Sequence, residues 1–520
     1  MKQLQAVSIV APGFAGLNTQ ESSVTLSSNF ALTADNCIID KFGRLGARKG
    51  WTQQTTDGVS ELGNLNIEAI GEHVNADNTT DIISAGNSKL FIGGVGSTLT
   101  DVTPAAYTIS ANNWKVASLN DHAFVVQKAH PPLIFTRESG SPVMHVETAH
   151  TAHGGPYTPS YGSSYPHDVV AAYGRFWAHD GSMVYWSTDI ADTAFPAFSG
   201  GTSGFLNIAA VLPNNVDTIT ALAVHNGFLI IFCQRNIIVY QGAENPLGDF
   251  GISDIIAGVG CVARDSVQST GGDLIFLSDT GVRSLGRLLQ EKSLPMRDLT
   301  KNVRDDLLVT MSTELGINTN YDKVRSVYSE ANAFYLLSFP STATVYCLDM
   351  RAALEDGASR VTTWSTTTTA FLRTRDRTLL LGKKNGIGKY EGYLDNTTQY
   401  RMKYFSNYID MDNSSMTKML KKISITVIGG SGQSFVIKTG YDYLGAAFSY
   451  PFTINEGIGS EYGIAEYNIA EFTAGVLIDR VNAQVQGSGK VIQIGFEANV
   501  EGSEISVQKL DMFVKTGRIS

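Results

Sequence analysis

Four histidines stand close together in the chain and could in principle bind a metal ion. A zinc site needs three or four His, Cys or carboxylate ligands at defined spacings. No cysteine or carboxylate stands at such a spacing beside these histidines, and the sequence therefore favours no metal site. The four residues are His145, His150, His153 and His167.

The patterns that mark common hydrolases are also missing. No Gly-x-Ser-x-Gly elbow is present from which a Ser-His-Asp site could be assembled. Paired carboxylates on a β-propeller would indicate a glycosidase. The Ser-x-Asp-x-Gly-x-x-Trp turns of sialidase-like propellers are not found, and Ser278–Gly281 completes only a turn. We therefore expect a protein that is not an enzyme and that uses no cofactor and no metal.

Composition indicates a folded all-β chain. Among 520 residues there are 51 glycines, the charged share is only 17% and the hydrophobic share is 43%, which is typical of many strands joined by tight turns. A net charge of −10 argues against a dedicated nucleic-acid binder but not against a surface along which DNA slides. Four widely spaced cysteines indicate small buried side chains made in a reducing compartment. The longest apolar run, Phe228–Cys233, is too short to span a membrane.

A unit of three strands separated by Gly, Asn or Asp turns recurs seven times between residues 53 and 400. The clearest copy has Ile219–Val224, the turn Asn226-Gly227, Phe228–Cys233 and Ile237–Tyr240. Asn-Gly and Asp-Gly between β-rich runs are strong hairpin signals. The units recur roughly every 33 to 59 residues, which fits propeller blades better than a sandwich. We predict an irregular β-propeller platform of five to seven blades over residues 53–400.

Two segments interrupt these repeats. Residues 145–167 are rich in Gly, Pro, Ser and Tyr without a period, and predict a long surface loop. Residues 293–310 place Leu299, Val303 and Leu307 at helical spacing, after an early Pro295. This pattern predicts one amphipathic helix, whose apolar stripe we expect to face the core more than a partner.

The two ends of the chain differ from the repeats. From residue 401 to 520 the strands lengthen, as in Ile423–Ile428 and Val491–Phe496, and predict a separate C-terminal antiparallel β-sandwich. Over residues 1–52, Leu26, Phe30, Ala31, Ala34 and Ile38 recur at helical spacing, and a turn follows around Lys41–Gly43. This N-terminal segment is therefore predicted to hold a short helix and a hairpin.

The same N-terminal segment resembles a known family. Gly-Phe-Ala-Gly-Leu-Asn-Thr-Gln (13–20), Asn-Cys-Ile-Ile-Asp (36–40) and Gly-Arg-Leu-Gly-Ala-Arg-Lys-Gly-Trp (43–51) resemble the N-terminus of tail nozzle (tail hub) proteins of short-tailed double-stranded DNA bacteriophages. The closing Leu-Asp-Met-Phe-Val-Lys-Thr-Gly-Arg (510–518) is similar to the end of these proteins. The likeness is strong over about forty residues and looser elsewhere.

This resemblance implies a structural protein of the virion, made in the cytoplasm of the bacterial host. It implies a homohexameric ring below the adaptor (head-to-tail connector) that encloses the DNA exit channel, lets DNA pass without sequence specificity and carries tail fibres or spikes. Because Arg44, Arg48 and Lys49 fall in the resembling stretch, we predict a role for them at a subunit or DNA-facing surface. The alternative is a glycan-binding or glycan-cleaving propeller that recognises a host cell surface, for which Tyr157, Tyr161 and Tyr165 would suit sugar stacking.

Overall fold

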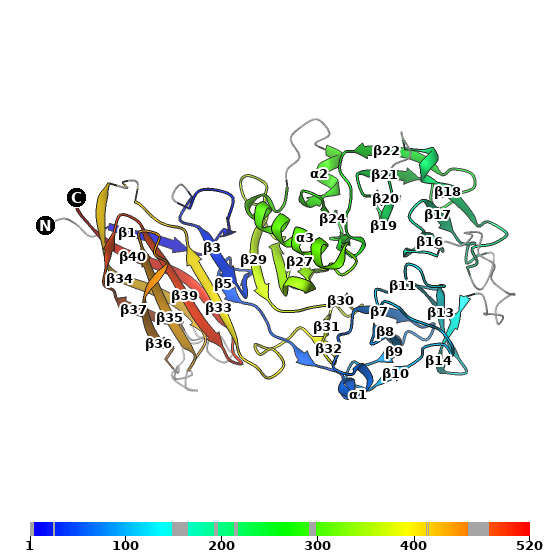
Figure 1. The fold of residues 1–520 in the computed structure, drawn as a ribbon, viewed down its shortest axis with the longest axis horizontal. Coiled ribbons are helices and arrows are strands. Elements are labelled where there is room, and N and C mark those ends of the chain that lie inside the picture. The colour runs from blue at the N-terminus through cyan, green and yellow to red at the C-terminus, as the bar shows by residue number, and fades with distance from the viewer. Residues whose placement is uncertain are drawn as a thin grey trace, which may run out of the picture.

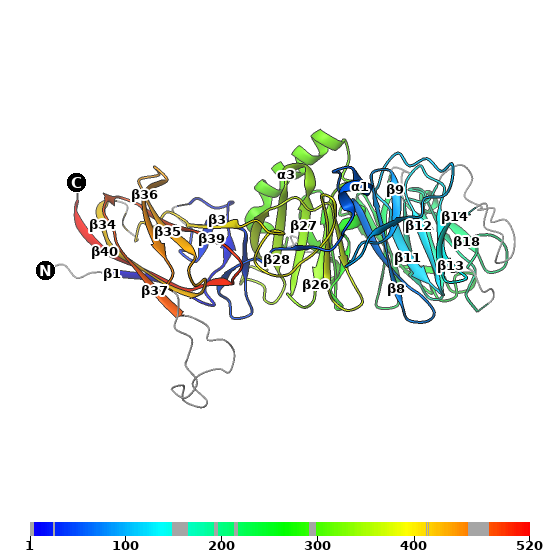
Figure 2. The same ribbon diagram turned by 90° about the horizontal axis from the view of Figure 1, so that it is seen from below.

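The chain folds into two lobes that lie side by side, a ring of β-sheets and a β-sandwich (Figure 1). Both chain ends lie in the sandwich, at the far end from the ring (Figure 2). This computed structural model describes residues 5–23, 26–147, 165–191, 196–212, 217–290, 298–411, 413, 415–455 and 478–519. None of the helices in these ranges is long and apolar enough to cross a membrane.

The ring is a β-propeller, which confirms the predicted fold. In the described part of the chain it has six four-stranded blades and one three-stranded sheet. Neighbouring blades contact each other through their first strands, which therefore surround the axis. The first four blades are β7 (Ala69–Val74), β8 (Thr80–Gly86), β9 (Lys89–Gly93) and β10 (Leu99–Asp101); β11 (Lys115–Leu119), β12 (His122–Val126), β13 (Leu133–Glu138) and β14 (Ser141–Val146); β15 (Asp168–Ala172), β16 (Arg175–His179), β17 (Met183–Trp186) and β18 (Gly204–Asn207); β19 (Ile219–His225), β20 (Phe228–Cys233), β21 (Asn236–Gln241) and β22 (Gly251–Ala257).

The rest of the ring is less regular. A short turn η3 (Arg264–Ser266) leads into the three-stranded sheet, and the last blade takes its fourth strand, β6 (Thr52–Gln53), from the N-terminal segment. This pairing of β6 with β32 closes the ring. The remaining elements are β23 (Gln268–Ser269), β24 (Leu274–Ser278) and β25 (Gly281–Ser284), followed by α2 (Leu285–Gln290); β26 (Arg325–Ser329), β27 (Phe334–Phe339), β28 (Thr344–Asp349) and β29 (Arg360–Ser365); β30 (Ala370–Arg373), β31 (Leu379–Lys383) and β32 (Gly386–Lys389), with α1 (Gly58–Leu62) beside β32.

The sandwich combines strands from both ends of the chain. One sheet has the order β37-β34-β40-β5-β4, with β1 on β40 and β38 on β34; the other has β3-β33-β39-β35-β36, with β2 on β3. The second sheet continues into the propeller blade β26–β29 through a single parallel pair, Thr363 with Asp35. The bounds are β1 (Gln5–Val10), β2 (Gly16–Leu17), β3 (Phe30–Asp35), β4 (Cys37–Ile39), β5 (Leu45–Ala47), β33 (Tyr400–Ser406), β34 (Met416–Gly429), β35 (Ser434–Tyr441), β36 (Ala446–Thr453), β37 (Ile478–Gln484), β38 (Ser488–Gly489), β39 (Ile492–Val500) and β40 (Ile505–Ile519).

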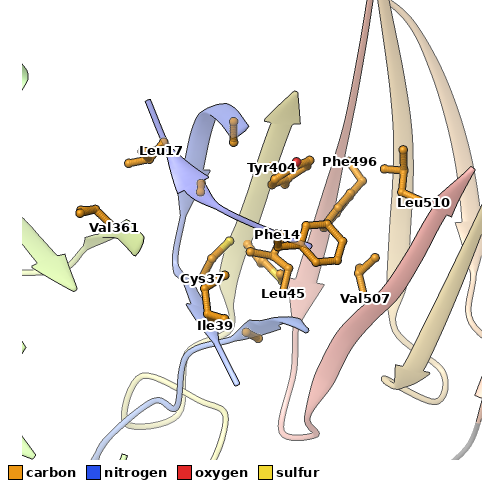
Figure 3. Packing of buried hydrophobic residues seen from close by; sticks show 14 of the residues in the cluster. Phe14, Leu17, Cys37, Ile39, Leu45, Val361, Tyr404, Phe496, Val507 and Leu510 are labelled. Carbon is orange, nitrogen blue, oxygen red and sulfur yellow. The ribbon is translucent and has the colours of Figure 1, made fainter. Parts of the chain in front are cut away.

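Residues of the N-terminal segment fill the core between the two sandwich sheets. Phe14 packs edge-on against Tyr404 of β33, with ring centroids 6.0 Å apart, and Tyr404 stacks on Phe496 of β39. Leu45 faces the same core opposite these rings (Figure 3). Residues 1–52, which we predicted as a segment of their own, are therefore divided between the sandwich and the closing blade. Residues 401–520 alone do not make the sandwich.

The helix predicted between Leu26 and Ile38 is wrong, because Phe30–Asp35 form β3 and Cys37–Ile39 form β4. Ala31 and Ala34 are both fully buried, and this spacing of three suggested a helix. In the structure it results from a bulge: the register of β3 against β33 shifts between Ala31 and Thr33. One extra residue in a strand turns an alternating burial pattern into a helix-like one. The predicted hairpin is confirmed, since β4 pairs antiparallel with β5.

The helix predicted over residues 293–310 is displaced. The structure has a 3-10 turn at Lys301–Val303 and then α3 (Arg304–Asn318), whereas residues 291–297 lie outside the described part. The helix continues past Thr310, and in this part Met311 and Glu314 are buried. The expected stripe does face the core, where Leu299, Val303 and Leu307 are buried.

The loop predicted over residues 145–167 falls mostly outside the described residues. Its first two residues, His145 and Val146, belong to strand β14.

The four cysteines are free thiols and all are buried, as expected for small apolar side chains. Burial raises the pKa of Cys233 and Cys261 to about 12, so these thiols are unreactive near neutral pH.

Candidate functional site

Arg48 does not lie on the surface, so the role predicted for it at a subunit or DNA-facing surface is wrong. Only 2% of the residue is exposed. Its guanidinium donates two hydrogen bonds to Asp395, at 2.8 and 2.7 Å, and Nε donates to Asn36 Oδ1 at 2.8 Å. The group also lies 4.1 Å from the ring centroid of Tyr400. Arg48 therefore joins the N-terminal segment to the loop after β32 and to β33.

The electrostatics of Arg48 fit this structural role. Burial acts to lower the pKa of Arg48, but the hydrogen bonds and charge of Asp395 outweigh it, and the pKa lies above its usual value. A bidentate arginine–carboxylate pair fixes orientation as well as charge. The pair thus sets how the end of the propeller meets the sandwich.

Arg44 and Lys49 are only partly buried. Arg44 pairs with Asp40 at 3.2 Å across the β4–β5 turn, and its guanidinium lies 4.1 Å from the ring centroid of Phe42. Phe42 is 56% exposed at the tip of this hairpin. The backbone N–H of Lys49 donates to Tyr390 Oη at 3.1 Å. A surface role for Arg44 and Lys49 stays a prediction.

A cavity of about 770 Å³, called the first axial cavity below, lies on the propeller axis. It is placed where the first strands of the blades begin, with Glu68, Asn113 and His167 in its wall. The end of α3 and the residues that follow it, 318–323, form another part of the wall. A second hollow of about 440 Å³ lies farther along the first strands and includes Glu72, Val116 and Tyr328.

A cluster of buried charges separates the two hollows. Arg264 faces the first, Asp265 faces the second, and Arg325 contributes to both. Arg264 pairs with Asp265 at 2.8 Å, Arg325 pairs with it at 3.3 Å, and Lys115 approaches it to 3.5 Å. These side chains come from η3, β26 and β11, so the cluster crosses the axis and links distant parts of the ring.

Hydrogen bonds to the backbone extend this axial cluster. Arg264 donates to the carbonyl of His167 at 2.7 Å, and Arg325 donates to the carbonyls of Glu68 and Asp322 at 3.2 and 2.6 Å. Burial acts to raise the pKa of Asp265, but the charges of Arg264, Lys115 and Arg325 outweigh it and hold the pKa well below its usual range. Asp265 is therefore ionised at neutral pH.

The four histidines weighed as possible metal ligands were not predicted to bind a metal, and the two that the structure describes lie in different places. His150 and His153 lie outside the described residues. His145 contacts Glu138 at 2.7 Å on the outer strand of its blade, whereas His167 lies at the axis beside His179. Burial and the charge of Lys128 lower the pKa of His167 to about 4, so it is neutral at pH 7. No group of three metal-binding side chains was found within the described ranges.

Sequence reasoning missed the axial charges because their partners are far apart in the chain. Lys115 and Asp265 are separated by 150 positions, and neither belongs to a recognisable motif. A signal did exist: Lys115 and Arg325 each begin the first strand of a blade, and Asp265 lies in η3, directly before the first strand of another sheet of the ring. The sequence shows that several inner strands begin with or follow a charged residue. Only the closed ring shows that these charges meet at the axis.

No protein-family model and no curated protein matches the sequence. Solved structures do match. The Neurospora crassa Pan2 WD40 domain is 9% identical with a TM-score of 0.35, covering 66% of this chain and 96% of that one. YCF48 bound to D1 peptide is 10% identical with a TM-score of 0.37, covering 66% and 97%. A protein from Lactobacillus plantarum is 10% identical with a TM-score of 0.34, covering 69% and 92%. The assignment of the fold rests on the strand pairing described above.

Proposed function

We propose that this protein is a structural component of a phage tail, a nozzle subunit that forms a homohexameric ring around the DNA exit channel. The observation that carries the proposal is the N-terminal stretch from Gly13 to Trp51, which resembles tail nozzle proteins. The ring would attach to the adaptor and hold tail fibres or spikes. Such a role needs no catalytic residue and no cofactor, and the protein would reside in the virion after synthesis in the host cytoplasm.

The place of the resembling stretch in the fold supports a framework role. Its strands β3, β4 and β5 pair with the sandwich, and β6 directly after it closes the propeller. Arg48, within the stretch, binds Asp395 at the junction. A subunit that transmits force between an adaptor and fibres needs its two lobes held together, and this segment does so.

The axis of the propeller is not a suitable path for DNA. Arg264, Asp265 and Arg325 cross it, and the first axial cavity has the volume of a small-molecule site. In the proposed ring the channel would therefore run between six copies, with each propeller as a wall or platform. Head-to-tail contacts that close on themselves give such a ring. The net charge of −10 would repel phosphates and let DNA slide.

Labelling of intact particles tests this function. Gold-labelled antibodies raised against the purified protein are applied to purified particles of a short-tailed phage whose genome encodes this chain, and the particles are imaged by electron microscopy. We expect label at the tail, below the capsid and above the fibre tips. Label confined to the capsid, or absence of the protein from purified particles, would contradict the proposal.

A further inference from the structure

The first axial cavity has the dimensions of a ligand site. Its volume of about 770 Å³ lies within the range of about 300–1,000 Å³ typical of small-molecule sites. It is walled by the starts of the inner strands, by the turns that hold Gln127, Lys128 and Arg235, and by the end of α3 with the turn after it. A cavity of this size would hold two or three sugar rings.

The wall carries a surplus of positive charge although the whole chain is acidic. Five basic residues line the cavity against three acidic ones, in a protein with a net charge of −10. Arg264 and Arg325 are held by Asp265 behind the wall, but Lys128, Arg235 and Lys323 are exposed. Among the described residues, Lys128 and Arg235 have no ion-pair partner. Lys128 and Arg235 are therefore the two wall charges best placed to meet an anion.

The other polar groups of the wall suit a ligand rich in hydroxyls. Side-chain amides both donate and accept hydrogen bonds, as sugar hydroxyls do. Gln127 is 2% exposed, and its Oε1 accepts no hydrogen bond from the described residues. Gln234 is an exposed amide in the same wall, and Tyr321 offers a half-buried aromatic ring for the C–H face of a sugar.

We propose that this axial cavity binds an acidic saccharide, an oligosaccharide of two or three rings that carries carboxylates. Lys128 and Arg235 would bind the carboxylates, and the amides of Gln127 and Gln234 the hydroxyls. The proposal does not depend on the tail function.

Isothermal titration calorimetry on the full chain tests the site, with trigalacturonic acid as the acidic probe. Galactotriose is the neutral probe, and AMP and inorganic phosphate report plain anion binding. We expect trigalacturonic acid to bind at least ten times more tightly than each of the other three. No binding of trigalacturonic acid, equal binding of galactotriose, or equal binding of AMP or phosphate would each overturn the proposal.

Substitutions then test where the probe binds. The double variant K128Q/R235Q removes two exposed charges from the cavity and is expected to weaken trigalacturonic acid at least tenfold. The matched control R377Q/K301Q removes two exposed charges that do not line the cavity and should bind as the natural protein does. Both variants change only exposed side chains, and circular dichroism checks that they fold. Equal affinity of the two double variants would overturn the location.

Discussion

Buried charges in this protein have structural partners, and Arg48 is the most informative of them. Its partner Asp395 lies in the loop that leads from the propeller to β33 of the sandwich. A buried pair adds little net stability compared with apolar residues of the same shape, but removal of one partner leaves an unpaired charge. Arg48 therefore serves mainly to orient the N-terminal segment against the loop before β33. Its removal should lower the free energy of unfolding.

The variant R48M tests this view. It leaves Asp395 partly buried without a counter-charge, and we expect the free energy of unfolding to fall by about 3 kcal/mol. Urea unfolding of the natural and variant proteins measures the change. The control R401M removes an exposed arginine that pairs with Glu497 at 3.2 Å on the same strand as Tyr400, and should change stability by less than about 0.5 kcal/mol. Similar losses of unfolding free energy in R48M and R401M would show that the buried pair of Arg48 matters no more than an exposed one.

Lys383 gives a prediction with a sign in pH. Its ammonium donates to Thr366 Oγ1, the carbonyl of Thr367 and Thr368 Oγ1, at 3.0, 2.8 and 2.9 Å. Burial, together with the charge of Arg48, lowers the pKa of Lys383 to about 7. Between pH 7 and about 10.4 the unfolded chain then holds a proton that the folded chain has released. Stability should rise with pH across this window.

The variant K383M isolates that effect. Relative to K383M, the natural protein should gain up to about 1.4 kcal/mol of unfolding free energy per pH unit above pH 7. Below pH 7 the lysine is charged in both the folded and the unfolded protein. The difference in unfolding free energy between the natural protein and K383M should therefore be constant there. Urea unfolding of both proteins at pH 6, 7, 8 and 9 measures it. Parallel curves over the whole range would contradict the lowered pKa.

At the scale of elements, closure of the ring depends on a short stretch of backbone. The N–H of Gln54 donates to the carbonyl of Ile387 at 2.8 Å, next to the β6–β32 pairing. Ile387 is fully buried, so its carbonyl would have no water to replace this bond. The last blade is therefore expected to loosen when this donor is lost.

The variant Q54P removes the N–H, and Q54A keeps it. We expect Q54P to lose about 1–3 kcal/mol, with faster hydrogen exchange in β31 and β32, and Q54A to behave as the natural protein. Hydrogen exchange read by mass spectrometry gives the local effect. If exchange in the last blade is the same in both variants, β6 does not hold the ring closed.

Much of the propeller could be predicted because each blade is local in sequence. The unit around Asn226-Gly227 shows strands and turns within about twenty residues, and the seven predicted units correspond to the sheets of the ring. The bulge in β3 could not be predicted, because its reason is the pairing with β33, about 370 positions later. The start of α3 was predicted too early for a different reason. The apolar stripe that predicted it includes Val303, which lies in the 3-10 turn before α3.

At the scale of the whole molecule, the N-terminal segment completes both lobes. Strands β1 and β5 pair with β40, and β3 pairs with β33. The sequence alone placed Arg48 on a surface, because two of its partners, Asp395 and Tyr400, stand about 350 positions away in the chain. The candidate cavity was equally hidden, since its wall draws Lys128, Arg235 and Tyr321 from three separate parts of the ring.

Removal of residues 1–50 should therefore unfold more than a tail. Without β1–β5 the apolar faces of β33 and β40 lose their cover, including Tyr404 and Leu510 (Figure 3). We expect strong binding of the dye ANS and loss of near-ultraviolet circular dichroism from the sandwich. The control removes only residues 1–4, which precede β1. A truncated protein with an unchanged spectrum and no dye binding would contradict this role.

The mass of the particle in solution is the sharpest test of the proposal that this chain is a ring-forming nozzle subunit. Light scattering on the purified protein, alone and mixed with the adaptor, is combined with negative-stain images of the same peak. Six copies of the 56.0 kDa chain, about 336 kDa, in hollow sixfold rings are the predicted result in at least one condition, because assembly can require the adaptor. A particle of 56.0 kDa in both conditions, with no ring in the images, would contradict the claim.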